Sequence, residues 1–440
     1  MDTQRNFVNI AQQVIDPQDD GQAIQQFMSD SPWEAAAVFK QIQSEVSQRP
    51  ELSGGMLTLD ESGDERAGDQ SAGAGRQYIG RLGKVEMGQV GVAIGYHKYN
   101  APGGTAVSTW VLVDAELYMP KPWFNETHKK LRKRLRIPKD RQFATKPQIG
   151  LQLIRRAKAN GLPFRVVGCD SVYGRDDQFR ADLDAEQVVY IGETPSNTQV
   201  YLQPPSIGIP DTPPDHVGRP FSLPTVTNSV EPVVVRDLVT RPEWTLHPIE
   251  VRQTERGLLT YDCTARRVWT ITSNQMVREE WLFIRRESDG QYSFSFSNAP
   301  ADTSLQQLAQ WRSERYFVER TFQDAKSEAG WDELVARKYS AWMHNTALDA
   351  LALWFIAETK LDWARDHPCD PKLANELKVV VLPALSMANV RKMLKAVMPL
   401  KQLSPEQATN AVVTHLVHRA QSTSSRLKKQ RGQLASNGGT

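Results

Sequence analysis

Three charged side chains, Arg315, Glu319 and Lys326, share one side of a predicted helix with apolar residues. The stretch from Trp311 to Trp331 has no proline, and its apolar residues recur at helical spacing, so we expect an amphipathic helix. At about 100° per residue, the three charges fall within roughly 40° of one another. Two explanations are open: an ordinary helix edge with an i,i+4 Arg–Glu pair, or a carboxylate held between two cations to meet a metal ion and a polyanion.

Two aspartates follow short apolar runs that are typical of buried strands. Asp60 comes directly after residues 56–59, and Asp170 comes directly after residues 164–169. Side chains converge where strands end, so both carboxylates are candidate ligands, although an aspartate at such a position is also a common turn former or helix cap. Because the sheet fixes the direction of residues that close an apolar run, we favour these two over their acidic neighbours. The neighbours are Glu61 and Asp64, and Asp176 and Asp177.

Two strand-terminal aspartates and a helical glutamate form an oxygen-rich set of potential ligands. Hard divalent cations such as Mg²⁺ and Mn²⁺ bind carboxylates and water, and keep positions open for phosphate oxygens. Two such ions can activate an attacking water or 3′-hydroxyl and stabilise the leaving oxygen. Arg315 and Lys326, on either side of Glu319, are suited to holding phosphates. The residue types therefore favour phosphodiester chemistry.

A run of basic residues lies between positions 128 and 146, where nine Lys or Arg stand against one Asp. Such a run is commonly a solvated surface, and it is also what contact with a nucleic-acid backbone requires. Under the second hypothesis the DNA contacts of this region are Lys129, Lys130, Arg132, Lys133, Arg134 and Lys146.

Composition narrows the class of protein. A chain of 440 residues with 40% apolar content can bury a substantial core in two or three domains, and its net charge of +2 says little about partners. Cys169, Cys263 and Cys369 are far apart and form no CxxC pair, which argues against a disulfide framework or a zinc knuckle. The amino terminus has no apolar leader and no run approaches about 18 apolar residues, so we expect a soluble cytoplasmic protein without a membrane segment.

The elements that must position these residues alternate between strands and helices. Residues 1–50 favour three short helices, one of them opening with a capping box at Ser31. Strands are expected at 56–59, 85–97 and 105–118. A helix capped by Thr145 leads to the strand 164–169, and a helix at 176–183 leads to a strand at 187–192. This β-α-β order predicts a parallel portion of one sheet.

In the second half of the chain, a proline-rich stretch interrupts the alternation of strands and helices. Residues 195–248 hold 11 of the 26 prolines, which excludes regular helices, and residues 258–283 alternate as strands do. A strand at 291–297 then leads into the helix that carries Glu319, and helices follow at 339–357, 387–397 and 405–420. The predicted divisions are a helical module at 1–52, a first core part at 53–194, a β-rich insertion at 195–288, a second core part at 289–360, and a helical region with a basic tail at 361–440.

Several ordered motifs resemble one family. They include L-T-L-D-E-S-G at 57–63, G-C-D-S-V-Y-G-R-D at 168–176 and W-R-S-E-R-Y-F-V-E-R-T-F-Q-D-A-K at 311–326. Together they are similar to the DDE transposases of bacterial insertion sequences, above all the insertion sequence 701 group, near the insertion sequence 4 branch with its signature Y-x2-R-x3-E-x6-K. The resemblance runs from about Ala35 to Ile356.

The resemblance implies an α/β fold: an RNase H-like mixed sheet flanked by helices, interrupted by a β-rich insertion domain, with helical N- and C-terminal parts. It implies that Asp60, Asp170 and Glu319 are a catalytic triad that binds two Mg²⁺ ions, for which Mn²⁺ can substitute. Their separations of 110 and 149 residues fit an insertion between the second Asp and the Glu. Further DNA contacts are expected at Arg315, Lys326, Arg312 and Arg320, with Trp269 and Trp281 as candidates to stack on a flipped base.

The implied function is that of a DNA transposase and endonuclease. It would bind the terminal inverted repeats of its element as a homodimer, hydrolyse phosphodiester bonds and join the freed 3′-hydroxyl to target DNA, at the nucleoid of a bacterial cell. Two departures from the family pattern leave an alternative open: Arg312 stands at the signature's Tyr, and residues 64–66 are D-E-R instead of an aromatic and lysines. They suit a domesticated, catalytically silent DNA-binding protein. A third hypothesis, a hydrolase of small phosphoesters, fits poorly with so many Lys and Arg outside the triad.

Overall fold

The computed structural model describes residues 6–99, 108–213, 217–219, 221–254, 257–333, 336–366 and 386–397, with residues 404, 406 and 409. Contacts divide the chain into two units, one of residues 1–32, 333–335 and 392–440, the other of residues 33–332 and 336–391. The helices α1 (Phe7–Val14) and α2 (Gln22–Asp30) belong to the first unit. All candidate catalytic residues belong to the second. The basic tail, Cys369 and all of the predicted helix at 405–420 except residues 406 and 409 lie outside the described residues.

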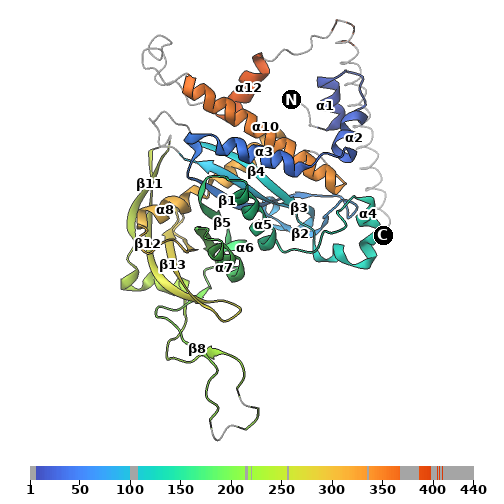
Figure 1. Cartoon of the computed structure of the whole chain (residues 1–440). Coiled ribbons are helices and arrows are strands. Elements are labelled where there is room, and N and C mark those ends of the chain that lie inside the picture. Colours follow the sequence, from blue (N-terminus) through green and yellow to red (C-terminus); the bar gives the residue numbers. More distant parts are fainter. Residues whose placement is uncertain are drawn as a thin grey trace, which may run out of the picture. The chain divides into compact units, whose positions relative to one another are not determined.

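Ten strands of the described chain form one mixed sheet flanked by helices (Figure 1). Their order is β11-β12-β13-β14-β6-β5-β1-β3-β2, and β4 pairs with β3. The neighbours β6, β5 and β1 run parallel, whereas the remaining pairs are antiparallel. The predicted α/β fold with an RNase H-like mixed sheet is confirmed. The strands are β1 (Gly55–Glu65), β2 (Gly75–Ile79), β3 (Lys84–Lys98), β4 (Thr109–Leu117), β5 (Phe164–Cys169), β6 (Tyr190–Thr194), β11 (His247–Thr254), β12 (Gly257–Ile271), β13 (Val277–Arg286) and β14 (Tyr292–Ser297).

The strand β1 is longer than predicted. The sequence suggested an end at Asp60, but the strand continues to Glu65 because β3 pairs with it along nearly its whole length and satisfies its backbone. The parallel pairing with β5 nevertheless stops where Leu59 lies opposite Cys169. Asp60 follows the last residue of β1 that pairs with β5, and Asp170 follows the end of β5 itself. The two aspartates therefore stand at the same edge of the parallel pair.

Helix beginnings were predicted with mixed success. The helix α5 (Lys146–Ala159) has the expected cap, a full capping box at Thr145. The capping box predicted at Ser31 is wrong: α3 (Ala35–Ser47) starts later and has no side-chain cap, while Ser31 ends α2. The 387–397 helix is confirmed as α12 (Met387–Val397).

Helices cover both faces of the central strands (Figure 1). Leu59 points to α5, where Gly150 leaves room for its side chain. Since alternate residues of a strand face opposite ways, Thr58 points to the other face, where it and Gly95 lie against Thr321 of α9. The elements on that second face are α8 (Leu305–Glu314), α9 (Phe317–Asp324) and α10 (Tyr339–Asp366), of which α10 also packs on β4 and α3.

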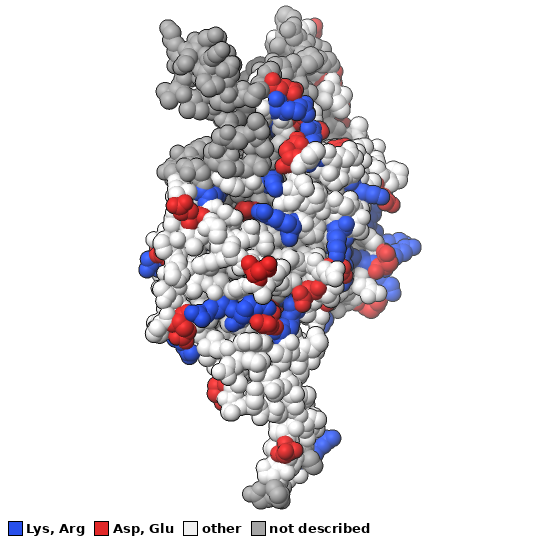
Figure 2. Space-filling model, turned by 60° about the vertical axis from the view of Figure 1, so that its left-hand side comes forward, with Lys and Arg blue, Asp and Glu red and all other residues white. Residues whose placement is uncertain are grey.

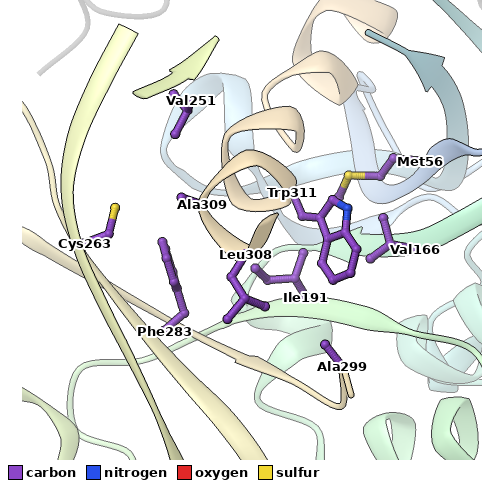
Figure 3. Close-up of a cluster of buried hydrophobic side chains, with 10 residues drawn as sticks. All are labelled: Met56, Val166, Ile191, Val251, Cys263, Phe283, Ala299, Leu308, Ala309 and Trp311. Carbon is purple, nitrogen blue, oxygen red and sulfur yellow. The ribbon is translucent and has the colours of Figure 1, made fainter. Parts of the chain in front are cut away.

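A cluster of buried apolar side chains anchors α8 (Figure 3). Leu308 and Trp311 point from this helix into the cluster, where the Trp311 indole lies beside Met56 of β1 and Val166 of β5. Burying such side chains contributes roughly 1.5–3 kcal/mol each. The burial fixes α8 on the sheet, and with it the cations that follow Trp311 in the chain.

The predicted single helix from 311 to 331 is wrong in detail. It is divided at Arg315–Tyr316, where the backbone N–H of Tyr316 donates to Ser313 and that of Glu319 donates to Tyr316, the tighter i→i−3 pattern. After α9, a π turn at Ala325–Ala329 closes the segment before Gly330, whose φ is +90°. The break lets α8 and α9 pack on different strands, α8 on β11, β12 and β5 and α9 on β4, β3 and β1.

Residues 195–288 contain two kinds of structure. In the described residues of the proline-rich part the strands are two residues long, β7 (Gln199–Val200) with β10 (Val233–Val234) and β8 (Ile207–Gly208) with β9 (Thr225–Val226). Short 3₁₀ helices follow at Val235–Thr240 and Pro242–Trp244. The later part, β11 to β13, continues the central sheet outward from β14. The predicted β character is therefore present, and the five divisions proposed along the chain stay predictions.

A buried ion pair ties this later part to the core. Arg180 of α7 (Asp177–Ala185) and Glu280 of β13 are 4% and 0% exposed, and the guanidinium Nε donates to Glu280 Oε1 over 2.9 Å. We expect Glu280→Ala to lower the free energy of unfolding by about 3–5 kcal/mol, because it leaves an unpaired buried charge. Chemical denaturation would measure this loss. Arg180→Met combined with Glu280→Leu should recover most of it, and a double variant no more stable than Glu280→Ala would contradict the explanation.

The expectations about membrane segments and cysteines can be compared with the described residues. None of their helices is long and apolar enough to cross a membrane. Cys169 and Cys263 are buried free thiols.

Candidate active site

Strand alternation places three carboxylates on one face of the sheet. Asp60 lies two residues after Thr58 in β1, so its side chain is on the same face of the sheet, toward α8 and α9 and away from α5. Gly168 of β5 approaches Arg315 from the same side, and Asp170 continues that alternation in extended backbone. On β6, Gly192 packs against Gly174 of the opposite face, which turns Glu193 toward α8 as well. The three acidic residues lie at one edge of the parallel strands β1, β5 and β6, on the face that α8 and α9 cover.

Asp60 and Asp170 repel each other. Burial raises the pKa of Asp60 to about 7, the charge of Asp170 adds to the rise, and Arg315 opposes it. Burial also raises the pKa of Asp170 to about 6, with repulsion from Glu61 as the next cause. Asp170 also caps α6 (Ser171–Gly174), because its Oδ1 accepts a hydrogen bond from the backbone N–H of Val172 over 3.0 Å. The pair is poised to gain from a nearby positive charge.

Arg315 supplies part of that charge. Its Nη1 lies 3.5 Å from Asp60 Oδ2, and its Nε lies 2.6 Å from Glu193 Oε1. Arg312 reaches the same Glu193 oxygen over 2.9 Å. Burial acts to lower the pKa of Arg315, but Glu193, Asp60 and Asp170 together raise it above its ordinary value. Arg315, predicted from its helical spacing, thus lies in the site, while Arg312 is only 8% exposed and is engaged inside the protein.

Glu193 was missed by the sequence analysis. The predicted strand at 187–192 is shifted to residues 190–194, so the glutamate belongs to the strand end and not to the following loop. A usable signal was present, since Val189, Ile191 and Glu193 alternate and the first two pack against the buried cluster of α8. A glutamate that closes such a run deserves the same weight as Asp60 and Asp170.

The competing carboxylate Glu61 faces the other way. Its Oε1 lies 2.6 Å from Lys146 Nζ at the start of α5, and its Oε2 accepts a long hydrogen bond, 3.4 Å, from Tyr173. Lys146 also lies over the Tyr118 ring. These contacts separate Glu61 from the α8–α9 face and give Lys146, a predicted DNA contact, an internal partner.

Glu319 lies near Arg315 but not in the aspartate pair. Its side chain is exposed, and its charge acts on Arg315. Within the described residues, no group of three or more His, Cys, Asp or Glu side chains is gathered closely enough to hold a metal ion. The structure therefore brings Asp60 and Asp170 together and leaves Glu319 beside their cation.

Lys326 extends the helical segment along β1. Its Nζ is 3.9 Å from Oδ1 of Asp64, another acidic residue on the Asp60 face. The eleven helical steps from Arg315 to Lys326 span roughly 16 Å, and the four strand steps from Asp60 to Asp64 span roughly 13 Å. The helical segment thus follows β1 with a cation near each end, and Glu319 lies between those two contacts.

The remaining predicted DNA contacts are scattered. Arg320 donates to Gln323, and Trp281 donates to the carbonyl of Pro300 beneath the Arg267 guanidinium. Trp269 is partly buried and forms a backbone bridge with Tyr201. On the face of β11 to β13 in Figure 2, basic and acidic side chains are interspersed, and the projecting part with β8 has few charges. All of these contacts stay predictions.

The basic run includes the short helix α4 (Lys129–Arg134). Arg132 donates to the carbonyl of Asn125 over 3.0 Å, so it supports the preceding turn. Lys129, Lys130, Lys133 and Arg134 are exposed, and Lys129 pairs with Glu126 over 3.1 Å. The helix offers exposed cations close together, and its contact with DNA stays a prediction.

Comparison with known proteins decides the family. A family of sequences described as DDE superfamily endonuclease matches residues 1–258, more than half of the chain. The chain belongs to the DDE superfamily endonucleases. The match includes Asp60 and Asp170 and ends before Glu319. The two aspartates that the fold brings together are therefore those within the matched part of this DDE endonuclease.

Similarity to a curated protein supports the same family. The chain is 29% identical over 191 residues to a protein of Microchaete diplosiphon named "Probable transposase for insertion sequence element IS701". The matched part is 42% of this chain and 44% of the relative, so the chain spans less than half the length of that protein. The resemblance to the insertion sequence 701 group, noticed from motifs, is thus confirmed at the level of the family.

Proposed function

We propose that this DDE endonuclease is a DNA transposase that hydrolyses phosphodiester bonds at the ends of its element and joins them to target DNA. The observation that carries the proposal is the partly buried pair Asp60 and Asp170, at the edge where the parallel pairing of β1 and β5 stops, with Arg315 against the first carboxylate. The name of the insertion sequence 701 relative supports the element-end substrate.

A divalent metal ion fits the residues present. Asp60 and Asp170 offer the oxygen donors that Mg²⁺ and Mn²⁺ prefer, and their mutual repulsion favours a cation between them. We assign these two residues and Glu319 to two bound ions, which would supply Lewis-acid activation of the nucleophile and stabilisation of the leaving oxygen. Arg315 and Lys326 would hold phosphates of the DNA on either side of Glu319.

Double-stranded DNA is the partner in this proposal, as terminal inverted repeats and as target. The exposed cations of α4 would contact the phosphate backbone, and two copies of the chain would pair the two ends of the element. The protein would act at the nucleoid in the bacterial cytoplasm. Such contacts should weaken steeply as salt rises, because counterions are released on binding.

Cleavage of end DNA tests the proposal. Purified protein should cut a duplex that carries the inverted repeats flanking its gene in the presence of Mg²⁺ or Mn²⁺, and should stop when EDTA is added. Electrophoresis of end-labelled DNA would measure the products, and a duplex of scrambled repeat sequence is the control. Binding of the repeats without cleavage in either metal would establish the silent DNA-binding alternative. Hydrolysis of a small aryl phosphate, with DNA left intact, would support a phosphoesterase.

A further inference from the structure

Glu193 forms ion pairs with two guanidinium groups through one carboxylate oxygen. Arg315 Nε and Arg312 Nη2 lie 2.6 and 2.9 Å from its Oε1, and the Glu193 side chain is only 22% exposed. The same Nη2 of Arg312 also lies 3.9 Å from Glu287 Oε1. Charges thus alternate from Asp60 through Arg315, Glu193 and Arg312 to Glu287. Glu193, Arg312 and Glu287 can therefore influence the position of Arg315 without touching DNA or metal themselves.

Arg315 is shared unequally between its two carboxylates. It lies 2.6 Å from Glu193 and 3.5 Å from Asp60, so most of its attraction is directed to Glu193. A guanidinium freed from Glu193 would keep Asp60, Asp170 and Glu319 as the anions that act on it, and Asp60 is the one it already contacts. It would then compete with a divalent ion for the same carboxylate oxygens.

We propose that Glu193 is a positioning residue that holds Arg315 beside Asp60 and so keeps the Asp60 carboxylate open to a divalent ion. The inference rests on the proposed function, since it assumes that Asp60 binds metal. It adds a fourth carboxylate to the site, one that acts through Arg315 and does not itself ligate the ion. Arg312 strengthens the hold: burial lowers its pKa to about 10, while the charge of Glu193 opposes that fall, so the two residues depend on each other.

Metal binding without DNA tests this role directly. Mn²⁺ binding to the full-length protein can be followed through the electron paramagnetic resonance signal of the free ion. Glu193→Gln should raise the dissociation constant about 5–10-fold, because Arg315 moves onto Asp60. In the Arg315→Gln background the same change should raise it no more than about twofold, since no guanidinium is left to move.

Two further variants separate this role from simpler effects. Glu279→Gln removes an exposed negative charge on β13 that pairs with Arg267, and it should change Mn²⁺ binding by less than about twofold. Glu193→Asp keeps the charge but shortens the side chain, so it should weaken binding in the same direction as Glu193→Gln, and it covers the case in which Glu193→Gln does not fold. Melting curves identify such a case.

The outcomes distinguish the two proposals. Equal weakening of Mn²⁺ binding by Glu193→Gln with Arg315 present and with Arg315 replaced would overturn the positioning role, because Glu193 would then act without Arg315. Cleavage by the wild type would still support the proposed function. Wild-type protein that neither cleaves DNA nor binds Mn²⁺ in a manner sensitive to Asp60→Asn would overturn the proposed function, and the inference with it.

Discussion

Asp60→Asn is expected to lower DNA cleavage by about 10³-fold or more and also to raise the melting temperature of the metal-free protein. The loss follows if the Asp60 carboxylate binds the metal, as proposed, because that ion would contribute several kcal/mol to transition-state stabilisation. The gain in stability follows from removing a buried charge that Asp170 repels. A rise of roughly 1 °C is expected for each kcal/mol recovered, because the unfolding entropy of a chain of 440 residues is large.

The stability gain should depend on pH. The pKa of Asp60 in the folded protein is about 7, well above its ordinary value of 3.8, so the folded state keeps a proton that the unfolded chain releases. Stability of the wild type should therefore fall as pH rises from about 4 to 7, and Asp60→Asn should remove part of that fall. Melting curves at several pH values in EDTA would measure it.

Asp302→Asn is the matched control, because it makes the same chemical change at an exposed aspartate. Its melting curves should follow those of the wild type at every pH. An Asp60→Asn protein that is less stable than the wild type at pH 8 would show that the Asp60 contact with Arg315 outweighs repulsion from Asp170. Undiminished cleavage by Asp60→Asn would exclude Asp60 from the catalytic triad.

The sequence predicted the parts of the site that local rules decide. Asp60 and Asp170 both close apolar runs, and parallel pairing of those runs necessarily brings the two residues to one edge of the sheet. Alternation along β1 then separates Asp60 from Glu61, a choice that spacing alone left open. The Thr145 cap of α5 was predictable for the same reason, since its hydrogen bonds are local.

Features that depend on distant partners were not predictable. β1 continues past Asp60 because β3 is long enough to pair with it. The residues of β1 alone do not predict that pairing. The helix from 311 divides near Arg315 because α8 and α9 pack on different strands, although its local propensity favours continuity. The alternation of residues 189–193 indicated the face of Glu193, but its ion pairs were not predictable, because the two arginines lie about 120 residues further along the chain.

Glu319→Gln is expected to lower cleavage by about as much as Asp60→Asn, about 10³-fold, while leaving the melting temperature nearly unchanged. Glu319 is exposed, and among the described residues it has no ion-pair or hydrogen-bond partner, so the folded protein loses little when its charge is removed. Surface substitutions of this kind usually change stability by less than about 0.5 kcal/mol. The catalytic loss follows if Glu319 completes the ligand set of Asp60 and Asp170.

The difference between the two variants is the informative result. Asp60 bears the cost of burial before any metal binds, whereas Glu319 remains solvated, so only Asp60→Asn should stabilise the metal-free protein. Cleavage assays and melting curves should be run side by side with Glu243→Gln, an exposed glutamate far from Asp60 in sequence, as the control. Full cleavage by Glu319→Gln would exclude Glu319 from the ligand set and leave the roles of Asp60 and Asp170 to their own variants.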